Sequence, residues 1–427
     1  MARGSRHRPV FARAPGAAAQ ANTGAAAAGD IVLCPRDGLF LKDGREWGPA
    51  GSGWALSLDW PAPSTLLGAL RTACGRVAEV RDRRAWRARE WQELATVTSL
   101  GATVALRRPL VASETGVATL WKTEHRVWPV PADALFLAGD AGKRVLRLDP
   151  RRTAVPSLGM DDDPAREALW WPRVDDPAKP AQPPPWWPES VWVDWLADPR
   201  ESREWTASFN GLKLARHVQA HVGIDRATGA ARDEILFAHD VIECLDNQQH
   251  EWAIGCQFNR KRNQDSPGPR AAIGGDRHLA RVETGANLFL CPDRLLKAFR
   301  DQPSRGIRLV AVTPAAFPAG WCPPGFMATG DEYRGRLPGI TDELILRAAR
   351  VPRAGHVSGW DMASGKPKPT TRLVPSGAVF HFVKADEKSC FTEAEARQLW
   401  LVTLGERVNE GFGRFVPGLW HPKENGK

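Results

Sequence analysis

Short hydrophobic runs alternate with polar, glycine- or proline-rich breaks along most of this chain. The apolar segments at 31–33 and 39–41 flank the turn Pro35-Arg36-Asp37-Gly38, which predicts a strand with a break. Similar short runs predict further strands at 102–106, 135–137 and 145–148. The pattern therefore indicates a sheet of short strands in the first part of the chain.

One segment between these strands has the periodicity of a helix. It opens with Pro61-Ala62-Pro63-Ser64-Thr65, and Ser64 or Thr65 is predicted to cap it. Apolar residues then recur at helical spacing, at Leu66, Leu67, Leu70, Ala73, Cys74 and Val77. A strand, a helix and several more strands is the layout of a ferredoxin-like sheet, which RNA-recognition folds share.

A second unit of mixed composition begins near residue 205. Helices are predicted at 292–300 and 392–408, the latter with Thr392 as N-cap and Glu395 completing a capping box. Strands are predicted at 236–237, 252–258, 287–290 and 307–312. We therefore predict an α+β protein with tandem ferredoxin-like (RRM-like) domains, irregular insertions and a C-terminal glycine-rich loop. The predicted domains are 30–204 and 205–427.

Two segments differ in amino-acid composition from these domains. Residues 1–29 are rich in Arg, Ala and Gly, which predicts a disordered arm, either a dispensable tail or a flexible basic segment that touches RNA. Residues 156–190, with an Asp161–Asp163 run, predict a long irregular insertion in the N-terminal domain. Its paired tryptophans either form a stacking platform for bases or fasten the insertion to its own domain; they are Trp170, Trp171, Trp186 and Trp187.

Composition narrows the class of protein. The 427 residues suffice for two or three domains, and the net charge of +9 comes with more arginine than lysine. Arginine favours contacts with phosphates and bases, although a GC-rich genome explains the bias equally well. The seven cysteines form no C-x-x-C pair, which argues against a zinc site and for a reducing cytoplasm. No apolar run approaches about 18 residues, so no contact with a membrane is expected.

The search for catalytic chemistry yields one weak candidate. His217 and His221 lie four residues apart, and histidine titrates near neutral pH, so they could cleave RNA as an acid–base pair. The alternative is that both occupy ordinary surface or interface positions. The Asp161–Asp163 run resembles a metal cluster only by composition. Phosphate-binding, nucleophile-elbow and dinucleotide motifs are missing. We therefore predict no enzymatic activity, no cofactor and no metal.

The RNA-binding candidates are stronger. The segment from Lys366 to Arg372 spaces cations with prolines, which leaves little freedom to lose on binding a phosphodiester. The glycines around Phe412 allow a close approach of the backbone. A basic glycine loop precedes Arg281. The predicted RNA-binding residues are Arg71, Arg277, His278, Arg281, Lys366, Lys368, Arg372, Gly411, Phe412, Gly413 and Arg414.

Several patches occur in the order of a known family. They are Pro61–Arg71, the hairpin elements Gly223-Ile224-Asp225, Thr228-Gly229 and Leu236-Phe237, Gly274–Arg277, Thr313–Ala315 with Gly320-Trp321, the stretch Ser358-Gly359-Trp360-Asp361 through Lys366–Pro369 to Pro375-Ser376-Gly377, and Gly411–Gly413. Over residues 30–420 the chain resembles the third-subunit family of the Cmr complex, the type III-B CRISPR effector, within the repeat-associated mysterious protein (RAMP) superfamily. The N-terminal arm has no counterpart in that family, and His217 departs from its usual pattern.

The resemblance implies tandem ferredoxin-like domains that grip the 5′ handle of the CRISPR RNA (crRNA) in an antiviral ribonucleoprotein. It implies contacts with the large polymerase-like subunit and the backbone RAMP subunit, indirect contact with target RNA, and catalysis by those neighbours. Lys366, Lys368, Arg372 and Arg414 would neutralise phosphates. Two alternatives remain open: a metal-independent endoribonuclease that processes repeat RNA through His217 or His221, and a scaffolding RAMP that touches only proteins.

Overall fold

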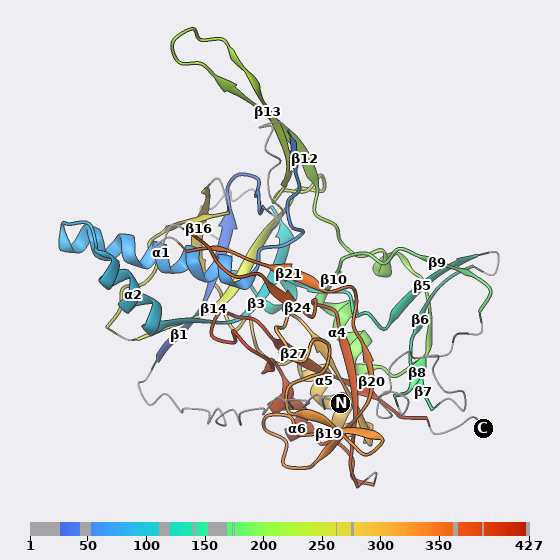
Figure 1. Ribbon diagram of the computed structural model, residues 1–427. Coiled ribbons are helices and arrows are strands. Elements are labelled where there is room, and N and C mark those ends of the chain that lie inside the picture. Colours follow the sequence, from blue (N-terminus) through green and yellow to red (C-terminus); the bar gives the residue numbers. More distant parts are fainter. Residues whose placement is uncertain are drawn as a thin grey trace, which may run out of the picture.

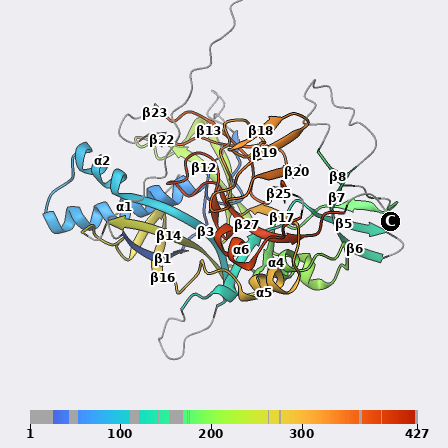
Figure 2. The same ribbon diagram turned by 90° about the horizontal axis from the view of Figure 1, so that it is seen from below.

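Two seven-stranded sheets form the framework of the protein (Figure 1). The computed structural model describes residues 26–42, 53–110, 120–139, 142–152, 169–172, 174, 176–261, 263–274, 277–361, 366–386 and 388–423. Strands predominate, and the helices lie beside the sheets in both views (Figures 1 and 2). The predicted α+β class is therefore confirmed.

The first sheet is assembled from segments far apart in the sequence. Its four central strands run antiparallel in the order β3-β14-β1-β16. The predicted boundary between residues 204 and 205 does not coincide with a break in this sheet, because β14 and β16 complete what β1 and β3 begin. In spatial order the strands are β10 (Trp186–Pro188), β4 (Arg126–Pro129), β3 (Thr98–Pro109), β14 (His250–Lys261), β1 (Ala26–Pro35), β16 (His278–Thr284) and β15 (Arg270–Ile273).

Helix α1 (Pro63–Asp82) covers one face of this sheet. Its apolar stripe, which includes Leu66 and Leu70, packs against Ile254 and Ala280. The cap predicted at Ser64 or Thr65 is wrong. The N-cap is Ala62, without a side-chain hydrogen bond, because Pro63 occupies the first turn and its fixed φ suits that position. Helix α2 (Ala88–Val97) follows and leads into β3.

The second sheet repeats this strand arrangement. Its central strands are antiparallel in the order β20-β25-β17-β27. In spatial order its strands are β18 (Phe326–Thr329), β19 (Glu332–Gly335), β20 (Leu344–Arg350), β25 (Val379–Lys384), β17 (Gly306–Ala311), β27 (Arg414–Trp420) and β26 (Val402–Thr403).

Helices α4 (Glu189–Ala197), α5 (Asp293–Asp301) and α6 (Glu393–Leu399) share one hydrophobic core with the second sheet. The capping box of Thr392 and Glu395 forms as predicted. The predicted helix over 392–408 is too long, because Leu401 adopts a φ of 58° and the next two residues pair with β27. The strand predicted at 287–290 is instead a turn, in which Asn287 has a φ of 56°.

Most of the tryptophans in and around the insertion pack inside the protein. Trp170, Trp186 and Trp187 are buried, whereas Trp171 is half exposed. The Trp187 ring lies against that of Trp195 on α4. Fastening the insertion is therefore the role of most of these residues, and Asp161–Asp163 lies outside the described residues.

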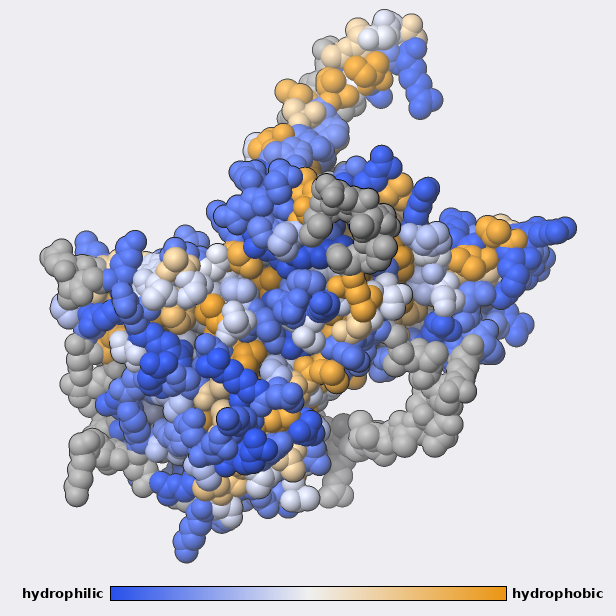
Figure 3. All heavy atoms as spheres, turned by 180° about the vertical axis from the view of Figure 1, so that it is seen from behind, coloured by the Kyte–Doolittle hydropathy of each residue, from blue (hydrophilic) through white to orange (hydrophobic). Residues whose placement is uncertain are grey.

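A projecting arm and several small sheets complete the fold. The arm is the hairpin of β12 (Arg216–Ile224) and β13 (Ala231–Ile242), with β2 (Gly53–Ala55) beside β13; Figures 1 and 3 show it standing away from the body. A four-stranded sheet contains β11 (Ser202–Glu204), β6 (Gly142–Arg147), β5 (Ala134–Gly139) and β9 (Lys179–Ala181). The remaining elements are the pairs β21 (Gly355–Val357) with β24 (Thr371–Leu373), β22 (Trp360–Asp361) with β23 (Lys366–Pro367) and β7 (Pro150–Arg151) with β8 (Trp171–Pro172), and the 3₁₀ turns η1 (Thr123–His125) and η2 (Ala207–Asn210).

A buried ion pair joins the second sheet to the segment that follows β4. The Arg308 guanidinium on β17 pairs with the Asp133 carboxylate, and both side chains are 0% exposed. Arg308 and Arg147 also donate to the carbonyl of Trp195 on α4. Burial opposes ionisation of Asp133, but the two arginines outweigh it and lower the pKa of that carboxyl.

Candidate nucleic-acid interface

The glycine-rich loop before β27 packs between the two main sheets. The Leu100 backbone N–H donates to the Asn409 carbonyl oxygen over 2.9 Å. Gly411 has a φ of 93°, and a Cβ there would lie 3.0 Å from side-chain atoms of Leu100 and Pro63. Gly413 has a φ of 71°, and a Cβ there would lie 2.0 Å from the Leu404 carbonyl oxygen. The close approach predicted for these glycines is made by the protein's own chain.

Two charged residues of the same loop hold its shape. Arg407 donates to both carboxylate oxygens of Glu410, over 3.0 and 2.8 Å, and its guanidinium lies 4.7 Å from the centre of the Phe412 ring. Burial would raise the pKa of Glu410, but Arg407, Lys368 and Arg71 together lower it. The loop is therefore a pre-organised element with its carboxylate ionised.

Phe412 packs against the inner side of the strands β21 and β24, where the basic segment from Lys366 to Arg372 ends. Its side chain is fully buried and clusters with Val357 of β21 and Leu373 of β24. Arg414 also faces inward, where it donates to the Thr403 hydroxyl, and burial lowers its pKa. The sequence predicts that both residues contact RNA, but Phe412 is buried beneath β21 and β24, and Arg414 is bound inside the protein by Thr403 and the Val408 carbonyl oxygen.

The outer face of this segment is basic. Lys366, Lys368 and Arg372 are exposed, and none of them forms an ion pair with any residue that the structure describes. Arg372 is paired across β21–β24 with His356, which is also exposed. Exposed cations that are not held in ion pairs are available to a polyanion, and Glu410 is a carboxylate within the electrostatic reach of Lys368. Sequence reasoning missed His356, whose placement depends on a strand pair too short to predict.

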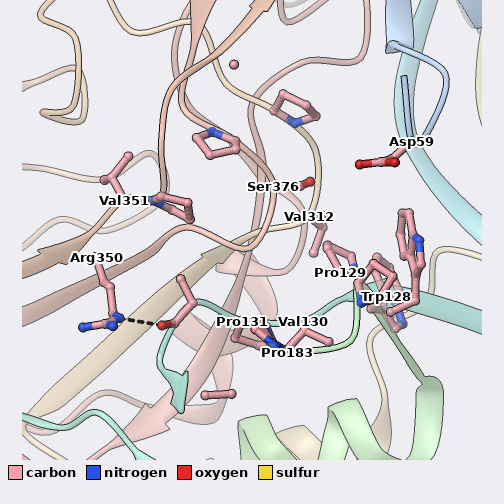
Figure 4. A pocket seen from close by; sticks show the side chains of 18 of the residues that line it. Asp59, Trp128, Pro129, Val130, Pro131, Pro183, Val312, Arg350, Val351 and Ser376 are labelled. Carbon is pink, nitrogen blue, oxygen red and sulfur yellow. Dashed lines mark hydrogen bonds between the residues drawn. The ribbon is translucent and has the colours of Figure 1, made fainter. Parts of the chain in front are cut away.

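A cleft of about 1390 Å³ opens beside this basic face. Figure 4 shows Pro129, Pro131 and Val312 on its walls, and Arg350 donating from Nε to the Ala132 carbonyl oxygen over 2.5 Å. Gly355, His356 and Leu373 also line it, so the cleft reaches the strand pair that carries Arg372, the cross-strand neighbour of His356. The turn Pro375-Ser376-Gly377 packs against the wall of the cleft, where the Gly377 carbonyl oxygen accepts a hydrogen bond from the Ala132 N–H over 2.8 Å.

Arg71 is placed beside the loop but serves the fold. Its guanidinium donates to the Thr98 hydroxyl and carbonyl oxygens and to the Ala95 carbonyl oxygen, over 2.8–2.9 Å. Burial lowers its pKa, against the field of Glu410. It therefore joins α1 to the start of β3, which differs from the predicted RNA contact.

The residues around the other predicted basic loop lie elsewhere. Arg277 is exposed in the turn between β15 and β16, with His278 next to it. Arg281 lies on the face of the sheet opposite α1, since its neighbour Ala280 packs on α1, and it lies 3.2 Å from Glu283. Gly275 and Asp276 lie outside the described residues. These positions do not share the cleft of the glycine loop.

The two histidines of the nuclease hypothesis lie on a strand of the arm. His221 stacks between Phe237 and His239, with ring centroids 5.0 and 4.7 Å apart. His217 pairs with the Glu243 carboxylate. The residues that the structure describes contain no group of three or more His, Cys, Asp or Glu placed to hold a metal ion. None of the described helices is long and apolar enough to cross a membrane.

Comparison with known proteins identifies the class. The profile of a family of CRISPR-associated proteins, described as CRISPR-associated protein (Cas_Cmr3), matches residues 31–420. The chain therefore belongs to the Cas_Cmr3 family, which confirms the resemblance found in its motifs.

Solved structures show a more distant likeness. A chain of the type III-B Cmr-beta complex bound to cognate target RNA and AMPPnP has 13% identity and a TM-score of 0.39, covering 82% of this chain and 86% of that one. In the same complex with cognate target RNA, the values are 13%, 0.40, 84% and 86%. Comparison with curated proteins finds no similar sequence.

Proposed function

We propose that this chain is a non-catalytic, RNA-binding subunit of a type III-B CRISPR effector complex and grips the 5′ handle of crRNA. Membership of the Cas_Cmr3 family supports the assignment to the complex. The observation that carries RNA binding is the exposed basic face of Lys366, Lys368 and Arg372, which have no ion-pair partner among the described residues. His356, the cross-strand neighbour of Arg372, lines the cleft. A phosphodiester backbone is the polyanion that such a face suits.

The glycine loop would support RNA binding indirectly, by holding the basic segment in place. Phe412 and the Arg407–Glu410 pair fix the β21–β24 hairpin, so its cations lose little freedom on binding. Arg277, His278 and Arg281 would form a separate, weaker contact, because Glu251 and Glu283 lie within 3.6 Å of Arg281. Contact with target RNA would then be indirect, through pairing with the held crRNA.

The tandem ferredoxin-like arrangement belongs to the same proposal. It is supported by the central strand order, which in chain order reads second, third, first, fourth in both sheets, all antiparallel. The strand pairing favours a division after β16, near residue 285, with the chain between β3 and β14 returning to the first sheet in its strands β4 and β10. A cytoplasmic location also remains a proposal, supported by seven free cysteines.

We propose that the partners are the large polymerase-like subunit and the backbone RAMP subunit, which the chain would bridge. Co-expression with each one alone and with both tests this. A bridging chain is expected to be recovered in a ternary assembly that neither of the other two proteins forms without it. Recovery of those two subunits as a stable pair in its absence contradicts the bridging role.

The nuclease alternative has one observation in its favour. Glu243 pairs with the imidazole of His217, an arrangement that can orient a general base. Its neighbour on the same face of the strand, His221, is instead occupied by ring stacking. The pair of histidines therefore does not form an obvious acid–base couple.

One experiment tests both functions. The purified full-length protein is incubated in EDTA with labelled repeat RNA and with mature crRNA, and gel mobility and product length are read from the same sample. Handle-dependent binding of intact RNA is expected. Cleavage at a single repeat position that is lost in His217→Ala would overturn the non-catalytic assignment. Absence of both binding and crRNA crosslinks would favour a scaffold that touches only proteins.

A further inference from the structure

Trp360 is an exposed tryptophan, whereas nine tryptophans of the described residues are buried. Its side chain is 58% exposed, whereas Trp121, Trp128, Trp187, Trp192, Trp195, Trp252 and Trp420 are almost completely inaccessible. A large indole surface in water is unfavourable unless a partner covers it, and exposed aromatic residues are enriched where a protein binds something.

The indole lies on a short two-stranded ribbon. Trp360 pairs across β22–β23 with Pro367, and the Lys368 N–H donates to the Gly359 carbonyl oxygen over 2.7 Å. Pro367 and Pro369 fix their own φ angles and restrict the residues before them. The strand opposite the ring therefore has little backbone freedom left to lose on binding.

The two faces of this ribbon carry different chemistry. Side chains alternate along a strand, so Trp360 shares one face with Pro367, while Lys366 and Lys368 point to the other. The base and the phosphate of a nucleotide likewise project to different sides of its sugar. An unpaired strand that runs along the edge of this two-stranded ribbon can place a base on the indole and its phosphates within reach of the long lysine side chains. Asp361, opposite Lys366, is the acidic residue of the ribbon.

We propose that Trp360 is a stacking platform for one unpaired base of the RNA that this chain binds. The inference rests on the proposed function and adds to it a base contact beside the phosphate contacts. Stacking on an aromatic ring is tolerant of base identity, so Trp360 would secure the strand more than read its sequence. A protein partner is the competing occupant, and the test separates it.

The test compares Trp360→Leu with Trp54→Leu, because Trp54 is equally exposed, at 57%, on β2 beside the arm. Affinity for handle RNA is measured over a range of salt concentrations with the full-length chain. Trp360→Leu is expected to weaken binding about 5- to 150-fold with an unchanged salt slope, because stacking involves no phosphate. Trp360→Phe keeps a smaller aromatic face and should restore part of the loss, and Trp54→Leu should bind as wild type.

A series of handle RNAs, each with one abasic nucleotide, identifies the stacked base. At one position, the abasic nucleotide should weaken binding by the wild-type chain. On that RNA, Trp360→Leu should cause no further loss of affinity. Equal losses on every RNA of the series would mean a structural role and overturn the proposal. So would unchanged RNA affinity of Trp360→Leu, including the case in which the variant instead loses a protein subunit. Failure of the wild-type chain to bind any handle RNA would overturn the proposed function as well.

Discussion

The Leu100 N–H and the Asn409 carbonyl oxygen, 2.9 Å apart, join the start of β3 to the glycine loop more than 300 residues later in the chain. The contact places Gly411 against Pro63 at the start of α1 and Glu410 in the electrostatic field of Arg71. Two of the sequence patches that identify the family thus meet in one interior joint. The basic hairpin β21–β24 rests on that joint through Phe412.

The first prediction concerns the basic face. Lys366→Ala with Lys368→Ala should weaken binding of handle RNA and lower the slope of log affinity against log salt by about 1.4, since each lost single-strand phosphate contact removes about 0.7. Filter binding at four salt concentrations measures both. Lys179→Ala with Lys297→Ala removes the same charge at two exposed positions elsewhere and should leave the slope unchanged. Normal crRNA occupancy in the Lys366/Lys368 variant would count against handle binding through this face.

The glycine loop gives a prediction about stability. Gly413→Ala should destabilise the protein by more than about 3 kcal/mol, because left-handed strain adds to a clash with the Leu404 carbonyl oxygen. Gly330→Ala is the matched control: its φ is 64°, but no atom lies within 4 Å of the added Cβ, so only about 1–2 kcal/mol is expected. Thermal unfolding compares the two. Equal shifts in midpoint would show that the Leu404 contact is unimportant.

The buried ion pair predicts a large cost for removing one partner. Asp133→Ala leaves the Arg308 guanidinium uncompensated in the interior and should cost about 3–5 kcal/mol. Glu343→Ala removes a half-exposed carboxylate 3.0 Å from Arg334 and should cost less than about 1 kcal/mol. Chemical denaturation of both variants checks this. A cost below 1 kcal/mol for Asp133→Ala would mean that water reaches the pair.

His381 makes stability depend on pH. Burial lowers its pKa from 6.5 to about 3, beside the charges of Asp133 and Arg308. The folded protein thus binds fewer protons than the unfolded chain between these values, so the contribution is present above pH 6.5 and is lost as pH falls toward 3. The limiting slope is about 1.4 kcal/mol per pH unit for one proton.

The comparison for this prediction is His381→Phe, which keeps a ring against Trp420 and removes the titration. Its stability should fall less steeply than that of the wild type between pH 6.5 and 4. Asp149, whose burial raises its pKa to about 6, acts in the opposite direction but is present in both proteins and cancels in the difference. Parallel unfolding curves against pH would rule out His381 as the source.

The sequence by itself determined the local elements and the family. Helical spacing located α1 and α5, and short apolar runs located β3, β5, β14 and β17, because periodicity reports which side of an element is buried. The local pattern predicted the wrong end for the helix at 392–408. Val402 and Thr403 are β-branched and pair with β27, so they extend the second sheet instead of the helix before them. The order of the motifs sufficed to identify the Cas_Cmr3 family.

Only the tertiary structure decided what faces outward. Phe412 and Trp360 are both aromatic residues beside glycine, yet one is fully buried and the other exposed. The difference depends on partners such as Leu373 and Ala316, which no local pattern brings together with Phe412. Likewise, β14 completes the sheet of β1 from more than 200 residues away. Burial is a property of the assembled contacts, so the choice between supporting residue and binding residue is made by packing.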